Sequence, residues 1–136
     1  MEQARRLAAL RIALLLTGVA FALGVPLLTW AWPDAWMWEP RQSEYEQMIV
    51  GLYVTLGVFV LLAIRDPLRH LSLIWFTAWS SLVHGGIMLV QAMVDPMEHA
   101  NLIGDVPALL VVGVALAILT PRARDLPAPA GARGAA

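Results

Sequence analysis

The residues best suited to chemistry lie in one apolar stretch, residues 70–95 of a chain of 136. His84 is the only histidine deep inside an apolar run. Polar or sulfur-containing side chains recur through this stretch at steps of three and four residues, which places them on one helix face; they are Thr77, Ser81, His84, Met88, Gln91 and Asp95. A helix that is apolar except for one such stripe is typical of a membrane span. We therefore expect the stripe to face other helices inside a bundle.

Two roles are open for His84. It can be a structural link that hydrogen-bonds one helix to another, because polar groups inside a bilayer need partners. It can also bind a ligand or relay a proton, since ionisable groups in membrane spans often mark a function. A bis-histidine haem within one chain is excluded, because His70 and His99 belong to opposite ends of the fold. A haem shared between subunits stays open, but no cofactor is predicted.

The sequence gives little support for catalysis or metal binding. It contains no phosphate loop and no metalloprotease motif, and no carboxylate follows Ser80, Ser81 and His84 at helical spacing. Acidic and histidine side chains in the loops could gather to hold a divalent cation, but their spacing matches no metal motif; they are Glu44, Glu46, Glu98, His99 and Asp105. No metal site is therefore predicted.

Glu46 and Asp105 also have simpler interpretations as helix-capping residues. Ser43 and Glu46 have the spacing of a capping box. Asp105 precedes Val106 and Pro107, which is typical of a helix N-cap.

Counting residues places Tyr53 near His84. Tyr53 lies seven residues after Glu46, and His84 lies seven residues before Gln91, roughly 10.5 Å in each helix. If the two helices are antiparallel neighbours, both side chains have nearly the same depth. We expect them to come within side-chain reach and to form the floor of a funnel whose rim holds Glu46 and Asp105.

A short segment rich in tryptophan precedes Glu46. Trp30, Trp32, Trp36 and Trp38 lie within nine residues, interrupted by proline. Tryptophan is enriched where lipid tails meet head groups, which favours an interfacial belt. A lip over a ligand cavity is the alternative.

Composition identifies the class of protein. Apolar residues make up 60% of the chain and charged residues 14%, whereas soluble domains carry about 25%. An integral membrane protein is therefore expected. The chain has no cysteine, which excludes disulfides, and its net charge of −1 gives no sign of nucleic-acid binding.

The predicted fold is all-α, an integral membrane four-helix bundle formed by residues 1–121. Its predicted spans are 7–30, 45–64, 69–94 and 102–119, followed by a flexible tail, 122–136, rich in Pro, Ala and Gly. Gly18, Gly24 and Pro26 predict an irregular first span. The fourth span is short, so either it begins near Asn101 or the bilayer thins there. Gly113 and Ala117 predict close helix packing.

The arginines predict the orientation. All nine basic residues are arginine. Eight of them belong to the two ends of the chain and to the loop between the second and third predicted spans, and only Arg41 belongs to the other two loops. By the positive-inside rule, the N- and C-termini should be cytoplasmic. The absence of lysine together with abundant alanine and leucine suggests a GC-rich bacterial genome, so the expected location is a bacterial inner membrane.

Five segments resemble the BphX-like family of small bacterial membrane proteins. They are 36–40, 43–53, 73–77, 79–88 and 104–109, within a resemblance that covers roughly residues 7 to 121. The members that give this family its name lie among genes for degrading aromatic compounds. The resemblance implies the same membrane fold and a hydrophobic substrate, but it transfers no site residue.

Three functions remain open. The first is binding or passage of a small hydrophobic compound, with Glu46, Tyr53, His84 and Asp105 as anchors beside Trp36 and Trp38. The second is a non-catalytic accessory subunit of a larger membrane complex, or a homo-oligomer. The third is a membrane enzyme that uses His84 as an acid or base. A cavity that touches His84 would favour the first or third, and a filled interior would favour the second.

Overall fold

The computed structural model describes residues 2–40 and 43–122, which form helices and no strand. The first helical stretch consists of α1 (Glu2–Val19), η1 (Ala20–Gly24) and α2 (Val25–Ala31). A short turn, η2 (Pro33–Ala35), leads to α3 (Ser43–Ala63). The remaining elements are η3 (Pro67–His70), α4 (Leu71–Val94), η4 (Pro96–Ile103) and α5 (Asp105–Leu119). The predicted flexible tail lies beyond residue 122, outside the described residues.

The helices have the length and composition of membrane spans. Three stretches, Glu2–Ala31, Glu44–Ala63 and Pro67–Val94, are each long and apolar enough to cross a bilayer. Pro96–Ile103 and Asp105–Leu119 are bent by 45° from one another, and they make a fourth span if the bent pair crosses as one. The predicted all-α membrane fold is confirmed. Of the two alternatives for the short fourth span, a helix that begins near Asn101 is wrong, because Gly104 has a non-helical backbone (φ −110°, ψ −109°) and α5 begins only after it. Thinning of the bilayer at this span stays a prediction.

The first span is irregular where the sequence predicted it. Residues Ala20–Gly24 form one turn of π-helix, in which the Val25 N–H donates to the Ala20 carbonyl five residues earlier. Pro26 follows directly and has no N–H to give to the preceding turn, which favours such a bulge.

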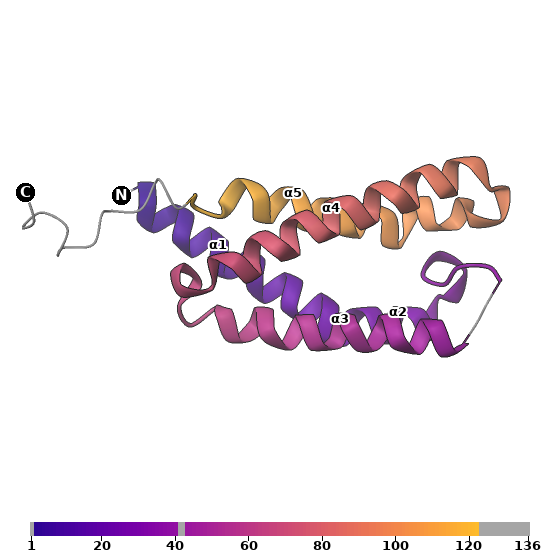
Figure 1. Cartoon of the computed structure of the whole chain (residues 1–136), viewed down its shortest axis with the longest axis horizontal. Coiled ribbons are helices and arrows are strands. Elements are labelled where there is room, and N and C mark those ends of the chain that lie inside the picture. The colour runs from indigo at the N-terminus through magenta and orange to yellow at the C-terminus, as the bar shows by residue number, and fades with distance from the viewer. Residues whose placement is uncertain (1, 41–42, 123–136) are drawn as a thin grey trace, which may run out of the picture.

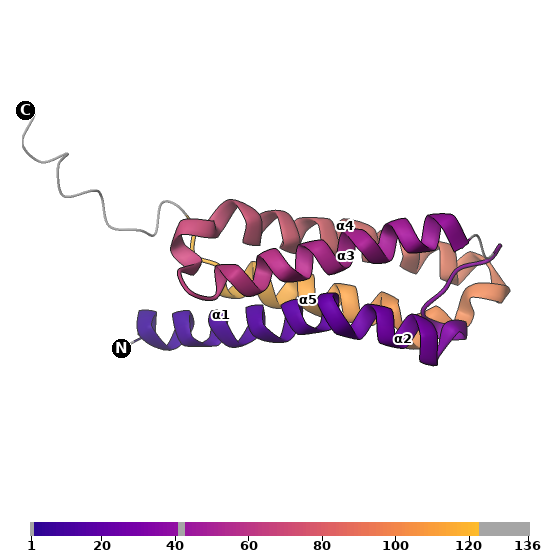
Figure 2. The ribbon, with the colours of Figure 1, turned by 90° about the horizontal axis from the view of Figure 1, so that it is seen from below.

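The long helices pair as two hairpins. In Figure 1, α4 and α5 run together along the top and α2 and α3 along the bottom, while α1 passes between the two pairs. Consecutive helices α3 and α4 contact each other little. The quarter turn in Figure 2 shows that the helices all run along the same long axis. The hairpins therefore meet at one end and spread apart at the other.

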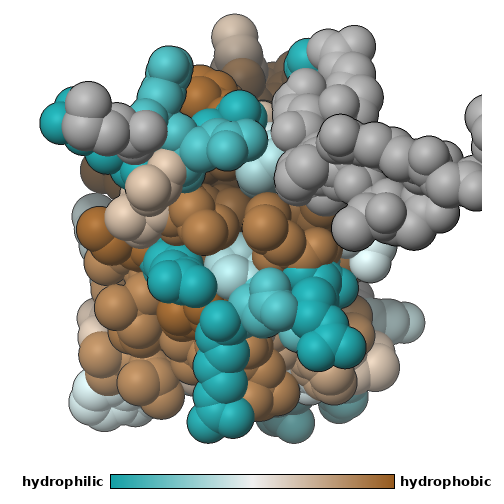
Figure 3. Space-filling view, turned by 90° about the vertical axis from the view of Figure 1, so that its left-hand side faces the viewer, coloured by the Kyte–Doolittle hydropathy of each residue, from teal (hydrophilic) through white to brown (hydrophobic). Residues whose placement is uncertain are grey.

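We call the end that holds Arg6, Ala63 and Thr120 the closed end. Its core joins all four long helices through side chains with no exposed surface: Leu10, Leu14, Val60, Ile74, Ala78 and Leu116. The Arg6 guanidinium donates to the carbonyls of Ile118, Leu119 and Thr120, 3.0 to 3.1 Å away, and so caps the C-terminus of α5. Figure 3 looks onto this end and shows hydrophilic side chains among hydrophobic ones. Both ends of the described chain thus lie on the same side of the bundle.

Glycines permit the close helix contacts within each hairpin. A Cβ atom at Gly57 of α3 would lie 2.5 Å from the Ala22 backbone nitrogen and 2.8 Å from the Gly18 carbonyl oxygen. A Cβ at Gly113 of α5 would lie 2.6 Å from Leu82 Cγ and 2.9 Å from the Ala78 carbonyl oxygen. The close packing predicted at Gly113 is confirmed.

Gly57→Ala is expected to lower the thermal denaturation midpoint of the purified protein, because its methyl group would meet backbone atoms that cannot rotate away. Overpacking of this kind costs about 1–3 kcal/mol of unfolding free energy. Gly51→Ala is the matched control on the same helix, since a Cβ there meets nothing within 4 Å. Equal midpoints for the two variants would contradict the packing described here.

Candidate functional site

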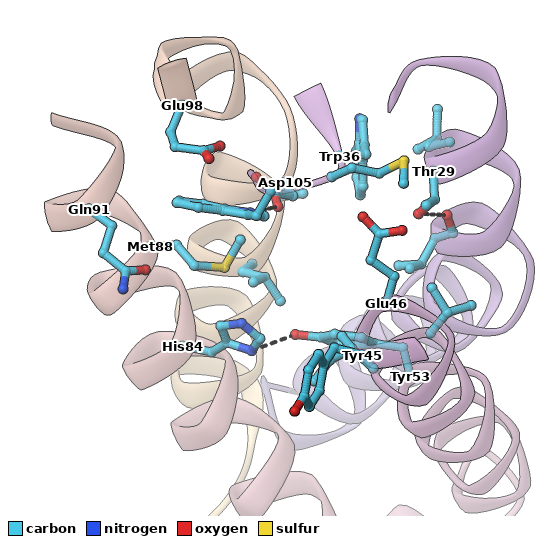
Figure 4. A pocket seen from close by; sticks show the side chains of 18 of the residues that line it. Thr29, Trp36, Tyr45, Glu46, Tyr53, His84, Met88, Gln91, Glu98 and Asp105 are labelled. Carbon is cyan, nitrogen blue, oxygen red and sulfur yellow. Dashed lines mark hydrogen bonds between the residues drawn. The ribbon is translucent and has the colours of Figure 1, made fainter. Parts of the chain in front are cut away.

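A cavity of about 860 Å³ lies between the two hairpins, toward the end opposite the closed end. We call that end the open end; it holds residues 32–40, which we call the tryptophan loop, and η4. Apolar side chains from η1, α2, α3, α4 and α5 form most of the cavity wall, among them Phe21, Val25, Val50, Met88 and Leu109. Figure 4 shows the polar side chains that reach into it.

The floor of the cavity is a hydrogen bond between the hairpins. Tyr53 Oη of α3 lies 2.8 Å from His84 Nδ1 of α4, and the tautomer of His84 decides which of them donates. The Tyr53 ring also packs edge-to-face on Phe21, with ring centroids 4.9 Å apart. The predicted approach of Tyr53 to His84 is confirmed (Figure 4).

A second, smaller cavity of about 230 Å³ lies beside this hydrogen bond, between α3 and α4. Three residues line both cavities and so lie between them: Ile49, Tyr53 and His84. The rest of the wall of the smaller cavity is apolar or hydroxyl-bearing: Leu52, Leu56, Phe76, Ser80 and Ser81.

The polar stripe of α4 faces the interior from Thr77 to Met88, as its spacing predicted, whereas Gln91 and Asp95 are exposed. Thr77, Ser81 and Met88 are buried, and the Thr77 hydroxyl donates to the Leu73 carbonyl of its own helix. His84 forms the floor, and Gln91 lines the cavity wall above it. Asp95, at the end of the stripe, is exposed; its Oδ1 accepts from the Met97 N–H, and the residue is the N-cap of η4.

Asp105 and the tryptophan loop meet at the rim of the cavity. Trp38 Nε1 donates to Asp105 Oδ2 at 2.9 Å. Asp105 is only 8% exposed, and its other oxygen, Oδ1, is buried with no hydrogen-bond partner. The prediction that Asp105 is a helix N-cap is wrong by one residue, because Gly104 holds that position. A side chain at Gly104 would collide with the Ala35 carbonyl, so the loop and the helix start are fitted to each other.

Glu98 joins the tryptophan loop to η4. Its Oε1 accepts from the Glu39 N–H and its Oε2 from Asn101 Nδ2, both at 2.7 Å, and the side chain is 3% exposed. Sequence reasoning considered Glu98 only as a possible metal ligand and missed this role. The spacing of Glu98 and Asn101, three residues apart on one helical face, was the available signal.

Glu46 faces the cavity from α3, across from Asp105 (Figure 4). It is half-buried, and its Oε1 is buried without a hydrogen-bond partner. The expected capping box also needs the side chain of Ser43, which lies outside the described side chains. Within residues 2–40 and 43–122, no group of three or more His, Asp or Glu side chains is arranged to hold a metal ion.

The two interpretations of the tryptophans apply to different residues. Trp36 and Trp38 are half-buried and line the cavity, as a lip would. Trp30 is 81% exposed, as expected of an interfacial residue.

All six predicted site residues line this one cavity: Trp36, Trp38, Glu46, Tyr53, His84 and Asp105. Two pairs are in direct contact, Tyr53 with His84 and Trp38 with Asp105. That these residues bind a ligand stays a prediction.

Comparison with known families places the chain. The profile of a family of unknown function, DUF6632, matches residues 4–136. The chain belongs to this family. Comparison with curated proteins and with solved structures gave no match. The match includes every residue that lines the cavity, so the cavity lies within the DUF6632 region, and the expected BphX-like name is not the one that matches.

Trp38→Phe is expected to destabilise this DUF6632 protein, because it removes the only side chain that donates a hydrogen bond to the buried Asp105 carboxylate among the described residues. Such a loss costs about 1–3 kcal/mol of unfolding free energy. Trp30→Phe is the control, since that indole is exposed and its replacement should change the denaturation midpoint little.

A double-mutant cycle with Asp105→Leu separates the hydrogen bond from the loss of indole packing. Removing both partners should cost less than the two single changes added together. Additive effects would show that the Trp38–Asp105 bond contributes nothing to stability.

Proposed function

We propose that this chain binds a small hydrophobic compound carrying a polar group, in the cavity between its two helix hairpins. The observation that supports the proposal is the cavity itself, with the Tyr53–His84 pair at its base. Its volume of about 860 Å³ falls in the range of roughly 300–1,000 Å³ typical of small-molecule sites. Its wall is mainly apolar with a few polar groups, which is the usual composition of such sites.

Binding fits the fold better than passage through it. Below the floor, the closed end is filled by side chains without exposed surface, including Leu14, Val60 and Leu116. A compound in the cavity would have to separate this core to cross the bundle. The resemblance to the BphX-like family agrees with a hydrophobic ligand. The accessory-subunit hypothesis expected a filled interior, which the cavity does not favour.

The orientation and location belong to the same proposal. We propose that the chain lies in a bacterial inner membrane with both ends cytoplasmic and the open end facing outward. The support is the distribution of arginine in the sequence, of which eight of nine residues belong to the two ends of the chain and the loop between the second and third predicted spans.

A fluorescent reporter that folds only in the cytoplasm, fused after Arg122, is expected to be bright in bacterial cells. The matched fusion after Glu39, in the tryptophan loop, is expected to be dark, because the positive-inside rule places that loop outside. Alkaline phosphatase fusions at the same positions should give the reverse pattern. Phosphatase activity after Arg122 would overturn the orientation.

Filling the cavity is expected to abolish binding of a neutral apolar probe, 1-naphthylmethanol. Ala108 lines the cavity, so Ala108→Phe occupies its volume. Val111→Phe is the control on the same helix, because Val111 is exposed and does not line the cavity. Equilibrium dialysis against protein in phosphatidylcholine nanodiscs, with empty nanodiscs subtracted, measures the bound probe.

The same assay tests the floor of the cavity. Tyr53→Phe and His84→Ala should weaken binding of the probe about 2- to 12-fold, since each breaks the hydrogen bond that holds the floor of the cavity, worth about 0.5–1.5 kcal/mol. His70→Ala, an exposed change at the closed end, is the control. If the wild-type protein binds no probe while repacking at Gly113 breaks assembly with other membrane proteins, the accessory-subunit function replaces this one.

A further inference from the structure

The cavity contains more acceptors than its own donors satisfy. Carboxylates from five positions on four different segments line it: Glu39, Glu46, Asp95, Glu98 and Asp105. Among the described residues, no arginine lines it, and His84 is the only basic side chain that does. Acidic residues alone do not define a site, so their hydrogen bonds decide the matter.

Two of these carboxylates, Glu98 and Asp95, have no buried oxygen that lacks a hydrogen-bond donor. Glu98 accepts two hydrogen bonds, one at each oxygen. Asp95 is exposed and accepts from the N–H of Met97. Neither leaves a buried oxygen in need of a donor.

Asp105 and Glu46 differ in this respect. Asp105 is more than nine-tenths buried and lines the cavity, yet its Oδ1 has no partner. Glu46 Oε1, on the opposite wall, is also buried without one. An ionised carboxylate only accepts hydrogen bonds, so both oxygens need a donor that the described chain does not supply. An unsatisfied buried acceptor destabilises the protein, and a ligand that donates a hydrogen bond to it would recover that loss.

Aromatic rings accompany these oxygens. The side chains of Trp36, Trp38, Tyr45 and Tyr53 line the same cavity. Figure 4 shows Trp36 at the upper part of the cavity, near Asp105 and Glu46. A ring face attracts a cation within about 6 Å, and the attraction is stronger where water is excluded. Below the rim, apolar side chains such as Val25, Val50 and Met88 leave room for an uncharged body.

We infer that the ligand is a hydrophobic amine, whose ammonium group lies between Asp105 and Glu46 while its apolar body fills the cavity toward Tyr53 and His84. An ammonium supplies several N–H donors and a positive charge, which two carboxylates on facing walls and their neighbouring rings would recognise. A carboxylic acid would add a negative charge to this site and be rejected. The inference rests on the proposed function, because it assigns a class to the compound bound in that cavity.

Three probes with one ring system test the charge. They are 1-naphthylmethylamine, 1-naphthylmethanol and 1-naphthoic acid, dialysed at pH 7 against the full chain in nanodiscs of neutral phosphatidylcholine. The amine is expected to bind at least tenfold more tightly than the alcohol, and the acid more weakly than either. An alcohol that binds as well as the amine would overturn the amine class while leaving the proposed function intact. Binding of none of the three would overturn the proposed function.

Charge-neutral variants locate the ammonium. Asp105→Asn and Glu46→Gln should each weaken binding of the amine about tenfold and change binding of the alcohol less than about twofold, since only the charged interaction is lost. Glu44→Gln is the matched control, because it removes the same charge from the same helix turn but does not line the cavity. If the amine loses equal affinity in the Glu44 variant, the preference reflects general surface charge and the inference is wrong. Denaturation midpoints measured on the same samples identify any variant that fails to fold, and the wild-type probe series stands without the variants.

Discussion

The hydrogen bond between Tyr53 and His84 joins two helices that otherwise contact each other little. In an apolar environment, a polar side chain without a partner costs several kcal/mol, so each of these residues requires the other. The bond fixes the spacing of α3 and α4 halfway along the bundle. Toward the open end the hairpins diverge, and the large cavity lies between them. Toward the closed end they converge on the fully buried core around Leu14 and Val60.

A second set of contacts holds the other side of the cavity. The tryptophan loop connects α2 to α3 and is bound to the hairpin of α4 and α5. The Trp38 indole donates a hydrogen bond to Asp105, and the Glu39 N–H donates one to Glu98. Ala35 also packs closely against Gly104. These contacts are mostly polar, whereas those of the closed end are apolar. The cavity therefore lies between a fully buried apolar base and a rim held by a few hydrogen bonds.

Several features of this fold could be predicted because they depend on local spacing. The helices follow from the lengths of the apolar runs, and the contact of Tyr53 with His84 follows from counting seven residues along each of two antiparallel helices. Gly113 identifies a close helix contact because only a small side chain fits there. Each of these needs only helical geometry and the requirement that polar groups face inward.

Other features depend on contacts between distant segments and could not be read from spacing. Glu98 bonds to a backbone N–H 59 residues away, which no local pattern encodes. Asp105 looked like an N-cap because its neighbours are typical of one, but the fit of Gly104 against Ala35 shifts the helix start by one residue. The width of the cavity depends on how far the two hairpins diverge, so it could not be predicted from the sequence pattern of either hairpin by itself.

The Tyr53–His84 hydrogen bond, with Ile49, lies between the large cavity and the smaller one. The smaller cavity behind it is lined by Leu52 and Phe76, which are 66% and 63% exposed on the outer surface of the bundle. In a bilayer, hydrocarbon chains would therefore reach the side of this hydrogen bond that faces away from the large cavity. The lipid would then contact the floor of the cavity as well as surround the helices. An affinity measured for this cavity would depend on the lipid as well as on the protein, so affinities should be compared within one lipid mixture.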